Sequence, residues 1–181
     1  MNYVIVSSQV LLGLVFLCSI AGKVGSADAY RAFRLSVAHL APPLRRSTKT
    51  VAPLVIAAEA AVPVALVVPT SVTAGFAAAA LLLVGFAVAL TGVLRRGETA
   101  ACHCFGGSEP VAARHVVRNV LLAGVALAGA VGRPVTRGAE TGSSAGLLLA
   151  VGVGVLLALL TVSLDDLAHL FGPVDPKEAG A

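Results

Sequence analysis

Residues 72–94 read VTAGFAAAALLLVGFAVALTGVL, an apolar stretch that contains no charged residue. An α-helix needs about 20 mostly apolar residues to cross the hydrocarbon core of a bilayer, so this stretch by itself predicts a membrane-spanning helix. Four other stretches have the same character, and the predicted spans are 3–22, 51–69, 72–94, 111–132 and 144–164. We therefore expect an all-α membrane protein, a compact bundle with a four-helix core and one added helix.

The overall composition also indicates a chain embedded in lipid. Hydrophobic residues make up 57% of the 181 positions, charged residues make up 12%, and the mean hydropathy is +0.94. A soluble domain carries about a quarter charged residues, so this chain has too few to cover a water-exposed surface. The net charge of +4 does not indicate nucleic-acid binding, because the basic residues cluster between the apolar spans. We expect one bundle domain over 1–170 in the lipid bilayer, followed by a polar tail over 171–181.

The loop over residues 23–50 has a helical pattern of its own. Its apolar residues recur at steps of three and four, and they are Tyr30, Phe33, Val37, Leu40 and Leu44. Arg31 and Arg34 lie off that stripe, so the pattern predicts a short interfacial amphipathic helix over about 28–40. An ordinary amphipathic connector is an equally good interpretation. Ser26 or Asp28 can cap the start of this helix.

The fifth span carries small residues at four-residue steps. They are Gly142, Gly146, Ala150, Gly154 and Ala158. Such a stripe lets two helix backbones approach closely. It predicts a packing face, either inside the bundle or between two copies of the chain in a homo-oligomer.

Two of the three cysteines lie in a polar loop and are the first candidates for chemistry. Residues 101–110 read ACHCFGGSEP, with Cys102 and Cys104 on either side of His103. Ser108 is a candidate cap for the helix that follows, and the positive charge at a helix start, with His103 beside it, favours thiolate over thiol. A disulfide between residues two apart closes a strained ring, which makes it a better oxidant. The pattern favours a reversible Cys102–Cys104 disulfide.

Other interpretations of the cysteines remain open. Cys102, His103 and Cys104 together with His115 are metal-binding residue types, but a zinc site takes four ligands in tetrahedral order. Three adjacent ligands meet that geometry poorly, so we predict no metal. A chance or purely structural pair is the third interpretation. Cys18, in the first span, is most simply a small buried hydrophobe.

Ionisable residues inside the spans predict a second feature near the cysteine loop. Glu59 and Arg118 both lie roughly 10–12 Å below the face that carries this loop, from the rise of about 1.5 Å per helical residue. An ionisable residue at that depth is costly unless it is paired. Lys23 ends the first span at the same face and can reach inward, and His115 and Asn119 share the Arg118 side of their helix. We predict a polar cluster in which Glu59 and Arg118 are coupled.

With these residues in view, the chain resembles the methylamine-utilisation MauE family, a branch of the DoxX-like membrane proteins. The likeness covers most of residues 5–130. The matching features are Gly13-x-x-Phe16 running to Lys23, Phe33, Pro42, Glu59, Cys102-x-Cys104-Phe105-Gly106, and Arg118-Asn119. The fifth span and the tail match in hydrophobicity alone.

The resemblance implies a function in thiol–disulfide chemistry in the inner membrane of a bacterium. Family members support disulfide formation in exported partners, often beside a thioredoxin-like protein. The arrangement is also similar to the thiol oxidants DsbB and vitamin K epoxide reductase, in which a cysteine pair passes electrons to a quinone. A quinone cofactor is therefore carried over by analogy of architecture alone. Unlike those oxidants, this chain has no second cysteine pair in its long loop, so an electron shuttle must come from a partner or from Cys18.

The charge pattern conflicts with the side of the membrane that this function requires. Positive charge marks cytoplasmic loops. The face of the cysteine loop carries Lys23, Arg31, Arg34, Arg45, Arg46, Lys49, Arg95, Arg96, Arg114 and Lys177. The opposite face carries Arg133 and Arg137. Charge therefore places the cysteines in the cytoplasm, whereas the resemblance places them outside.

Three functions are consistent with the sequence. The first is a membrane thiol–disulfide redox protein that acts on a thioredoxin-like or other cysteine-containing exported partner. The second is a non-catalytic scaffold or maturation subunit for a secreted redox protein. The third is a small metal or solute carrier that uses Glu59 and Arg118. A redox assay on a thiol partner separates the first from the second.

Overall fold

The computed structural model describes residues 2–40, 47–96, 113–135 and 143–171, and the regular structure in these segments is helical. The helices are α1 (Asn2–Val24), α2 (Ala27–Leu40), α3 (Thr48–Val67), α4 (Val72–Arg96), α5 (Ala113–Val135) and α6 (Ser144–Phe171). All of these except α2 are long and apolar enough to cross a membrane. The expectation of an all-α protein with five membrane-spanning helices is confirmed.

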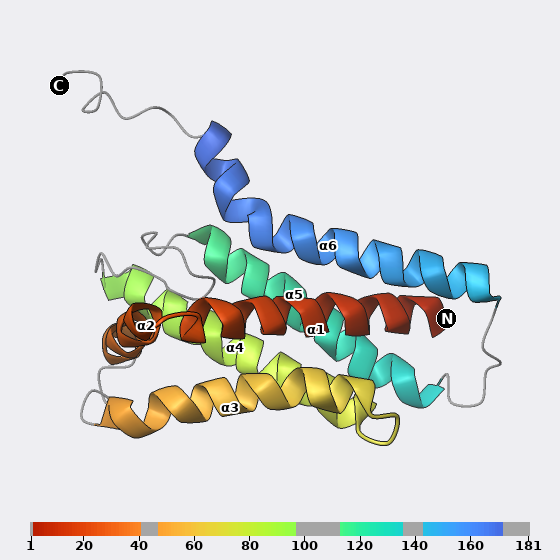
Figure 1. The fold of residues 1–181 in the computed structure, drawn as a ribbon, viewed down its shortest axis with the longest axis horizontal. Helices are drawn as coiled ribbons and strands as arrows, with labels where there is room; N and C mark the ends of the chain where they lie inside the picture. The colour runs from red at the N-terminus through yellow and green to blue at the C-terminus, as the bar shows by residue number, and fades with distance from the viewer. Residues whose placement is uncertain (1, 41–46, 97–112, 136–142, 172–181) are drawn as a thin grey trace.

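Four of the long helices form the core, and α6 is added at its side. Each of the neighbours α1 and α3, α3 and α4, α4 and α5, and α5 and α1 is in contact, so the four helices close a ring. α6 packs along α1 on the outside of this ring, and its last turns bend away from the bundle (Figure 1). The expected arrangement of four helices plus one is therefore confirmed.

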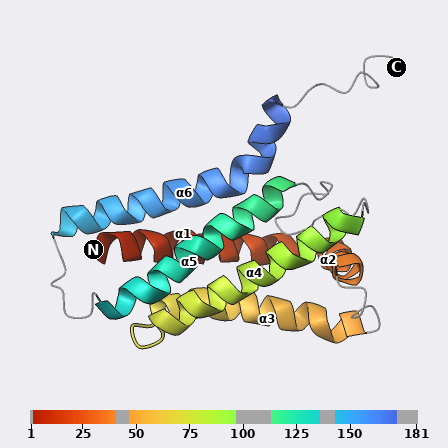
Figure 2. The same ribbon diagram turned by 180° about the vertical axis from the view of Figure 1, so that it is seen from behind.

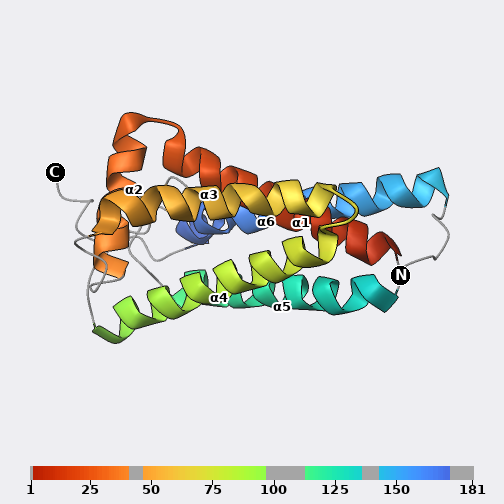
Figure 3. The same ribbon diagram turned by 90° about the horizontal axis from the view of Figure 1, so that it is seen from below.

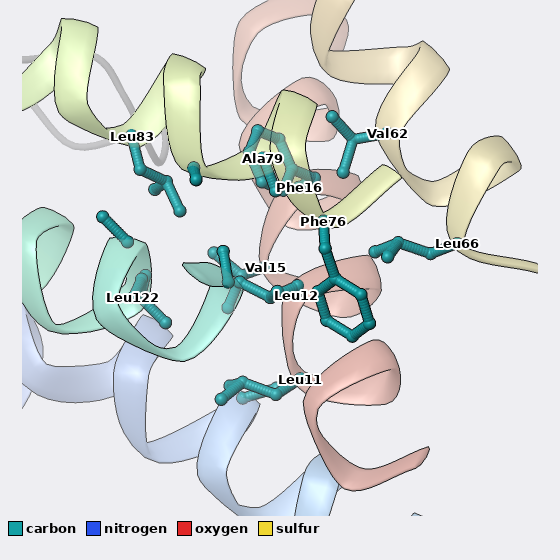
Figure 4. Close-up of a cluster of buried hydrophobic side chains, with 14 of the residues drawn as sticks. Leu11, Leu12, Val15, Phe16, Val62, Leu66, Phe76, Ala79, Leu83 and Leu122 are labelled. Atoms are coloured by element: carbon teal, nitrogen blue, oxygen red, sulfur yellow. The ribbon is translucent and has the colours of Figure 1, made fainter. Parts of the chain in front are cut away.

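Apolar side chains of the four core helices fill the centre of the bundle (Figure 4). Leu12, Val62 and Phe76 are fully buried there, and Leu122 contributes from α5. The outer surface is also rich in large apolar side chains, such as Leu81 and Leu148, which are more than 70% exposed. A soluble monomer rarely leaves such broad apolar surface open, so the outside of this bundle suits contact with lipid.

The helices alternate between two ends of the bundle. The ends of α1, α4 and α6, the starts of α3 and α5, and the whole of α2 lie at one end (Figure 1). The tight α3–α4 turn and the start of α6 lie at the other end (Figures 1 and 2). Segments 41–46 and 97–112 therefore leave from the same end, as expected. We call this end the cysteine-loop end, because the 97–112 segment contains Cys102 and Cys104.

α2 lies crosswise to the bundle axis at the cysteine-loop end (Figure 3). Its apolar residues Phe33 and Val37 are buried and pack with Ala52 at the start of α3. The Ser26 hydroxyl accepts a hydrogen bond from the Ala29 N–H at 3.0 Å, so Ser26 caps the helix start. Asp28, the other candidate cap, pairs with Arg31 on the exposed surface. This orientation agrees with a helix lying in the membrane interface.

The small-residue stripe of α6 packs against α1 of the same chain. A side chain at Gly154 would bring its Cβ to 2.7 Å from the Ser7 carbonyl oxygen. The Ser7 hydroxyl donates a hydrogen bond of 2.8 Å to the Ala150 carbonyl, and Ala150 and Ala158 are buried. Of the two expected uses of the stripe, the structure has packing inside the bundle. Gly142 lies outside the described residues.

The predicted fifth span, 144–164, agrees with the apolar part of α6, Ser144–Ser163, and the helix itself continues to Phe171. One local expectation was wrong. Cys18 was expected to be buried, but it is exposed on the outer face of α1. A thiol is apolar enough to face lipid as readily as the protein interior. The segment 172–181, most of the expected tail, lies outside the described residues.

Candidate functional site

A buried ion pair between Lys23 and Glu59 forms the centre of the candidate site. The Lys23 ammonium donates a hydrogen bond to Glu59 Oε1, and the two side chains are 1% and 0% exposed. The ammonium also donates to the Ser19 hydroxyl at 2.8 Å. Ser19 precedes Lys23 by four residues, which places both on one face of α1. The pair thus joins α1 to α3 at the cysteine-loop end.

Two aromatic rings enclose the lysine ammonium. Its nitrogen lies 5.1 Å from the centre of the Phe33 ring of α2 and 5.4 Å from the Phe86 ring of α4. Both distances are within the range of cation–π attraction, which strengthens when the cation is shielded from water. α2 therefore does more than lie in the interface, because its Phe33 covers the buried charge. Four helices contribute to one lysine site.

α5 contributes a buried polar face to the same region. His115, Arg118 and Asn119 are all buried, and the Asn119 amide donates to the His115 carbonyl at 2.7 Å. Asn119 and Lys23 line one small cavity, with room of about 20 Å³ for a water-sized sphere. That volume is sufficient for about one water molecule. The cavity links the α5 polar face to the Lys23 site.

The predicted ion-pair partner of Glu59, Arg118, is wrong. Among the described residues, Glu59 forms its ion pair with Lys23. The reason lies in the packing order, since α3 contacts α1 directly whereas α5 packs against α4 and α1. Burial of both Glu59 and Arg118 was predicted correctly. Glu59 Oε2 accepts no hydrogen bond from the described residues, so it is an acceptor still open to a water or a polar group.

The remaining predicted site residues are Cys102, His103 and Cys104, and they lie outside the described residues. Their segment joins Arg96 at the end of α4 to Ala113 at the start of α5. Within the described segments, no group of three His, Cys, Asp or Glu residues has the geometry of a metal site. The redox pairing of the two cysteines stays a prediction.

Sequence reasoning missed two members of the lysine site and undervalued a third. Ser19 and Phe86 were not singled out, and Phe33 was noted as part of an apolar stripe and as a feature shared with the MauE family, without a contact to Lys23. The four-residue spacing between Ser19 and Lys23 is a signal that could have found Ser19. No comparable signal marks Phe86, because its contact with Lys23 depends on how α4 packs beside α1 and α2.

Comparison with known proteins agrees with this architecture. The sequence profile of the family described as methylamine utilisation protein MauE matches residues 1–132. The methylamine utilization protein MauE of Paracoccus denitrificans is 38% identical over 160 residues, which cover 86% of this chain and 83% of that protein. No solved structure matches the chain. The matched range includes the whole lysine site, and the chain therefore belongs to the MauE family of multi-pass bacterial membrane proteins.

Proposed function

We propose that this protein is a membrane thiol–disulfide redox protein of methylamine utilisation, with Cys102 and Cys104 as its redox pair. One observation carries the proposal furthest. The buried polar cluster around Lys23 lies at the bundle end from which the Cys102–Cys104 segment departs and to which it returns. Buried ionisable groups in a membrane helix are expensive and indicate a functional site by default. The family match supplies the physiological setting.

The proposed reaction is an exchange of one disulfide for another. A thiolate of an exported partner attacks the Cys102–Cys104 disulfide and forms a mixed disulfide, which the partner's second thiolate resolves. The partner gains a disulfide, and Cys102 and Cys104 become thiols after taking up two electrons and two protons. Reoxidation of Cys102 and Cys104 to the disulfide passes these two electrons and two protons to a membrane quinone, which becomes a quinol. The quinone enters by analogy of architecture with other membrane thiol oxidants.

In this proposal the buried polar cluster around Lys23 supports the segment that carries Cys102 and Cys104. The Lys23–Glu59 hydrogen bond fixes the end of α1 to the middle of α3, and the Lys23–Ser19 hydrogen bond holds the lysine against α1. His115 and Asn119, joined by a hydrogen bond, lie in the first turns of α5, which follows the cysteine segment. A rigid support of this kind keeps a loop disulfide presented to a partner. The cluster residues are therefore assigned a positioning role.

The scaffold function remains the second candidate, since binding of a partner by the same segment requires no exchange of electrons. The carrier function gains no support from the described residues. Its proposed Glu59 carboxylate is tied to Lys23, and the adjoining cavity has room for about one water. A solute pathway needs more space than that.

The test is an oxidation assay with purified protein in liposomes that contain quinone. The probe is a reduced dithiol partner of the thioredoxin type, and the readout is its free thiols, counted by alkylation and mass spectrometry. Wild type should oxidise the partner, whereas Cys102→Ser and Cys104→Ser should not. Cys18→Ser is the matched control, because Cys18 faces outward from α1, and it should retain activity.

Two outcomes would contradict the redox proposal. Equal partner oxidation by wild type and by both loop variants would remove Cys102 and Cys104 from the chemistry. Stable partner binding without any change in its thiols would favour the scaffold function instead. Peptide mapping of the protein itself should show a two-proton difference between oxidised and reduced forms, confined to the peptide that contains both cysteines.

A further inference from the structure

A second feature lies on the outer surface of the bundle, in a groove between the second half of α4 and the first half of α5. These two helices lie side by side (Figure 2). The groove has a volume of about 550 Å³, and its walls include Val84 and Val88 from α4 and Val116 and Val120 from α5. Because the surrounding surface faces lipid, an apolar hydrocarbon chain is the natural occupant of these walls.

The polar end of the groove carries positive charge. Arg95 lines the groove at the cysteine-loop end and is exposed there. Within the described residues, no carboxylate forms an ion pair with Arg95. Thr91, the other polar residue of the lining, donates its hydroxyl hydrogen to the Ala87 carbonyl at 2.7 Å. Arg95 is therefore the side chain of the lining that offers unused donors to a ligand.

A second guanidinium lies beside the same end of the groove. Gly92 is part of the lining, and an added Cβ there would lie 3.3 Å from Arg96 Nη1. The Arg96 side chain therefore folds back along α4 over Gly92 rather than extending away from the bundle. Arg96 has an interaction of its own, so Arg95 is the residue that makes this end of the groove suit an anion.

The length of the groove matches one leaflet of a bilayer. It runs along α4 from Arg95 to Val84, which is eleven residues. At about 1.5 Å per residue this is roughly 16 Å. The hydrocarbon core of a bilayer is about 30 Å thick, so one leaflet supplies about 15 Å. The groove thus extends from the membrane interface to about the bilayer midplane.

We propose that this groove is a binding site for an anionic phospholipid, with one acyl chain along the α4–α5 walls and the phosphate at Arg95. A zwitterionic lipid offers the same acyl chain, but its cationic headgroup is disfavoured beside the Arg95 guanidinium. A quinone offers an apolar tail, but its neutral ring makes no use of the charge. The proposal concerns the outer surface of the bundle and does not depend on the proposed redox function.

The experiment is native mass spectrometry of the detergent-purified full chain after exposure to vesicles of phosphatidylglycerol and phosphatidylcholine in equal amounts. Wild type should retain phosphatidylglycerol in preference to phosphatidylcholine. Arg95→Gln should reduce this preference by about fivefold, the electrostatic effect of one basic residue near an anionic surface. Arg95→Lys should keep most of it. Arg31→Gln, which changes an exposed arginine on α2 that already pairs with Asp28, is the charge control.

A second pair of variants tests the groove itself. Val88 is 67% exposed and lines the groove, whereas Leu121 is 66% exposed on α5 and lies outside the lining. Val88→Trp should fill the groove and remove the retained lipid, and Leu121→Trp should leave retention unchanged. The proposal is overturned if wild type retains both lipids equally, if Arg95→Gln keeps the full preference, or if the two tryptophan variants behave alike. Displacement of phosphatidylglycerol by added ubiquinone would also overturn it, in favour of a quinone site.

Discussion

At the scale of single residues, the Lys23–Glu59 pair is the most constrained feature of the molecule. Both side chains are almost completely buried, and each provides the counter-charge for the other. Removing one partner leaves the other charge in a low-dielectric interior, which typically costs about 3–5 kcal/mol for a buried pair. Replacing both removes the two charges together, so it should cost less than the sum of the single changes.

We therefore predict strong coupling between Lys23 and Glu59. Lys23→Met and Glu59→Gln should each lower the stability of the bundle, and the double variant should be more stable than additivity requires. Thermal unfolding in detergent, followed by circular dichroism, measures the stabilities of wild type and the three variants, which form a double-mutant cycle. The same cycle for Glu59→Gln and Arg118→Gln should be close to additive, because these side chains form no ion pair with each other. Equal coupling in both cycles would contradict the structure.

The site shows where sequence reasoning succeeds and where it stops. The burial of Glu59, Arg118, His115 and Asn119 could be predicted, because membrane spans have a known direction and an ionisable residue inside one must face the protein. The choice of Lys23 as the partner of Glu59 could not be made with certainty. It depends on which helices are neighbours in the bundle, and five spans of similar hydrophobicity do not encode that order in their composition.

At the scale of helices, the apolar runs predicted all five spans to within three residues at each end. α6 continues beyond its span to Phe171, because hydrophobicity reports where lipid contact ends and not where backbone hydrogen bonding ends. The crosswise α2 was predicted from its stripe, but its cover over Lys23 was not. In the sequence pattern, Phe33 is one apolar residue among several on its stripe. Its contact with the Lys23 ammonium exists because α1 and α2 fold against each other.

The contact between α1 and α6 leads to a prediction at this scale. Gly154 faces α1, where an added Cβ would lie 2.7 Å from Ser7 O, so Gly154→Leu should force the helices apart and cost about 1–3 kcal/mol. Gly152 is two residues away on the exposed side, with nothing within 4 Å of an added Cβ. Gly152→Leu is the matched control and should leave the melting temperature nearly unchanged. Equal losses from both variants would indicate helix propensity as the cause rather than packing.

At the scale of the whole molecule, the distribution of basic residues conflicts with the side of the membrane that the proposed function requires. Most basic residues lie on the cysteine-loop end, which the positive-inside rule assigns to the cytoplasm. Disulfide formation in an exported partner requires the same end to face outward, because persistent disulfides are rare in the cytosol. The proposed lipid site offers a physical reason for part of the excess charge, since Arg95 would bind an anionic headgroup on either side of the membrane.

The order of the helices predicts opposite sides for two exposed serines. Ser47 precedes α3 and Ser143 precedes α6, and the three spans α3, α4 and α5 lie between them. Single cysteines at these positions, in a background with Cys18, Cys102 and Cys104 changed to serine, should therefore react with a membrane-impermeant maleimide from opposite sides. Labelling of both from the same side of intact cells would mean that one of the three helices does not cross the membrane.

The same labelling experiment decides whether the redox proposal can act on exported partners. Ser47 lies at the cysteine-loop end, so its accessibility reports the compartment that Cys102 and Cys104 face. The proposed function predicts that Ser47→Cys is labelled from outside intact cells and that Ser143→Cys is labelled after the membrane is opened. The reverse pattern would follow the positive-inside rule. It would place the thiols in the reducing cytosol, where a partner would have to be cytosolic and the disulfide transient, and the proposal of an exported partner would then fail.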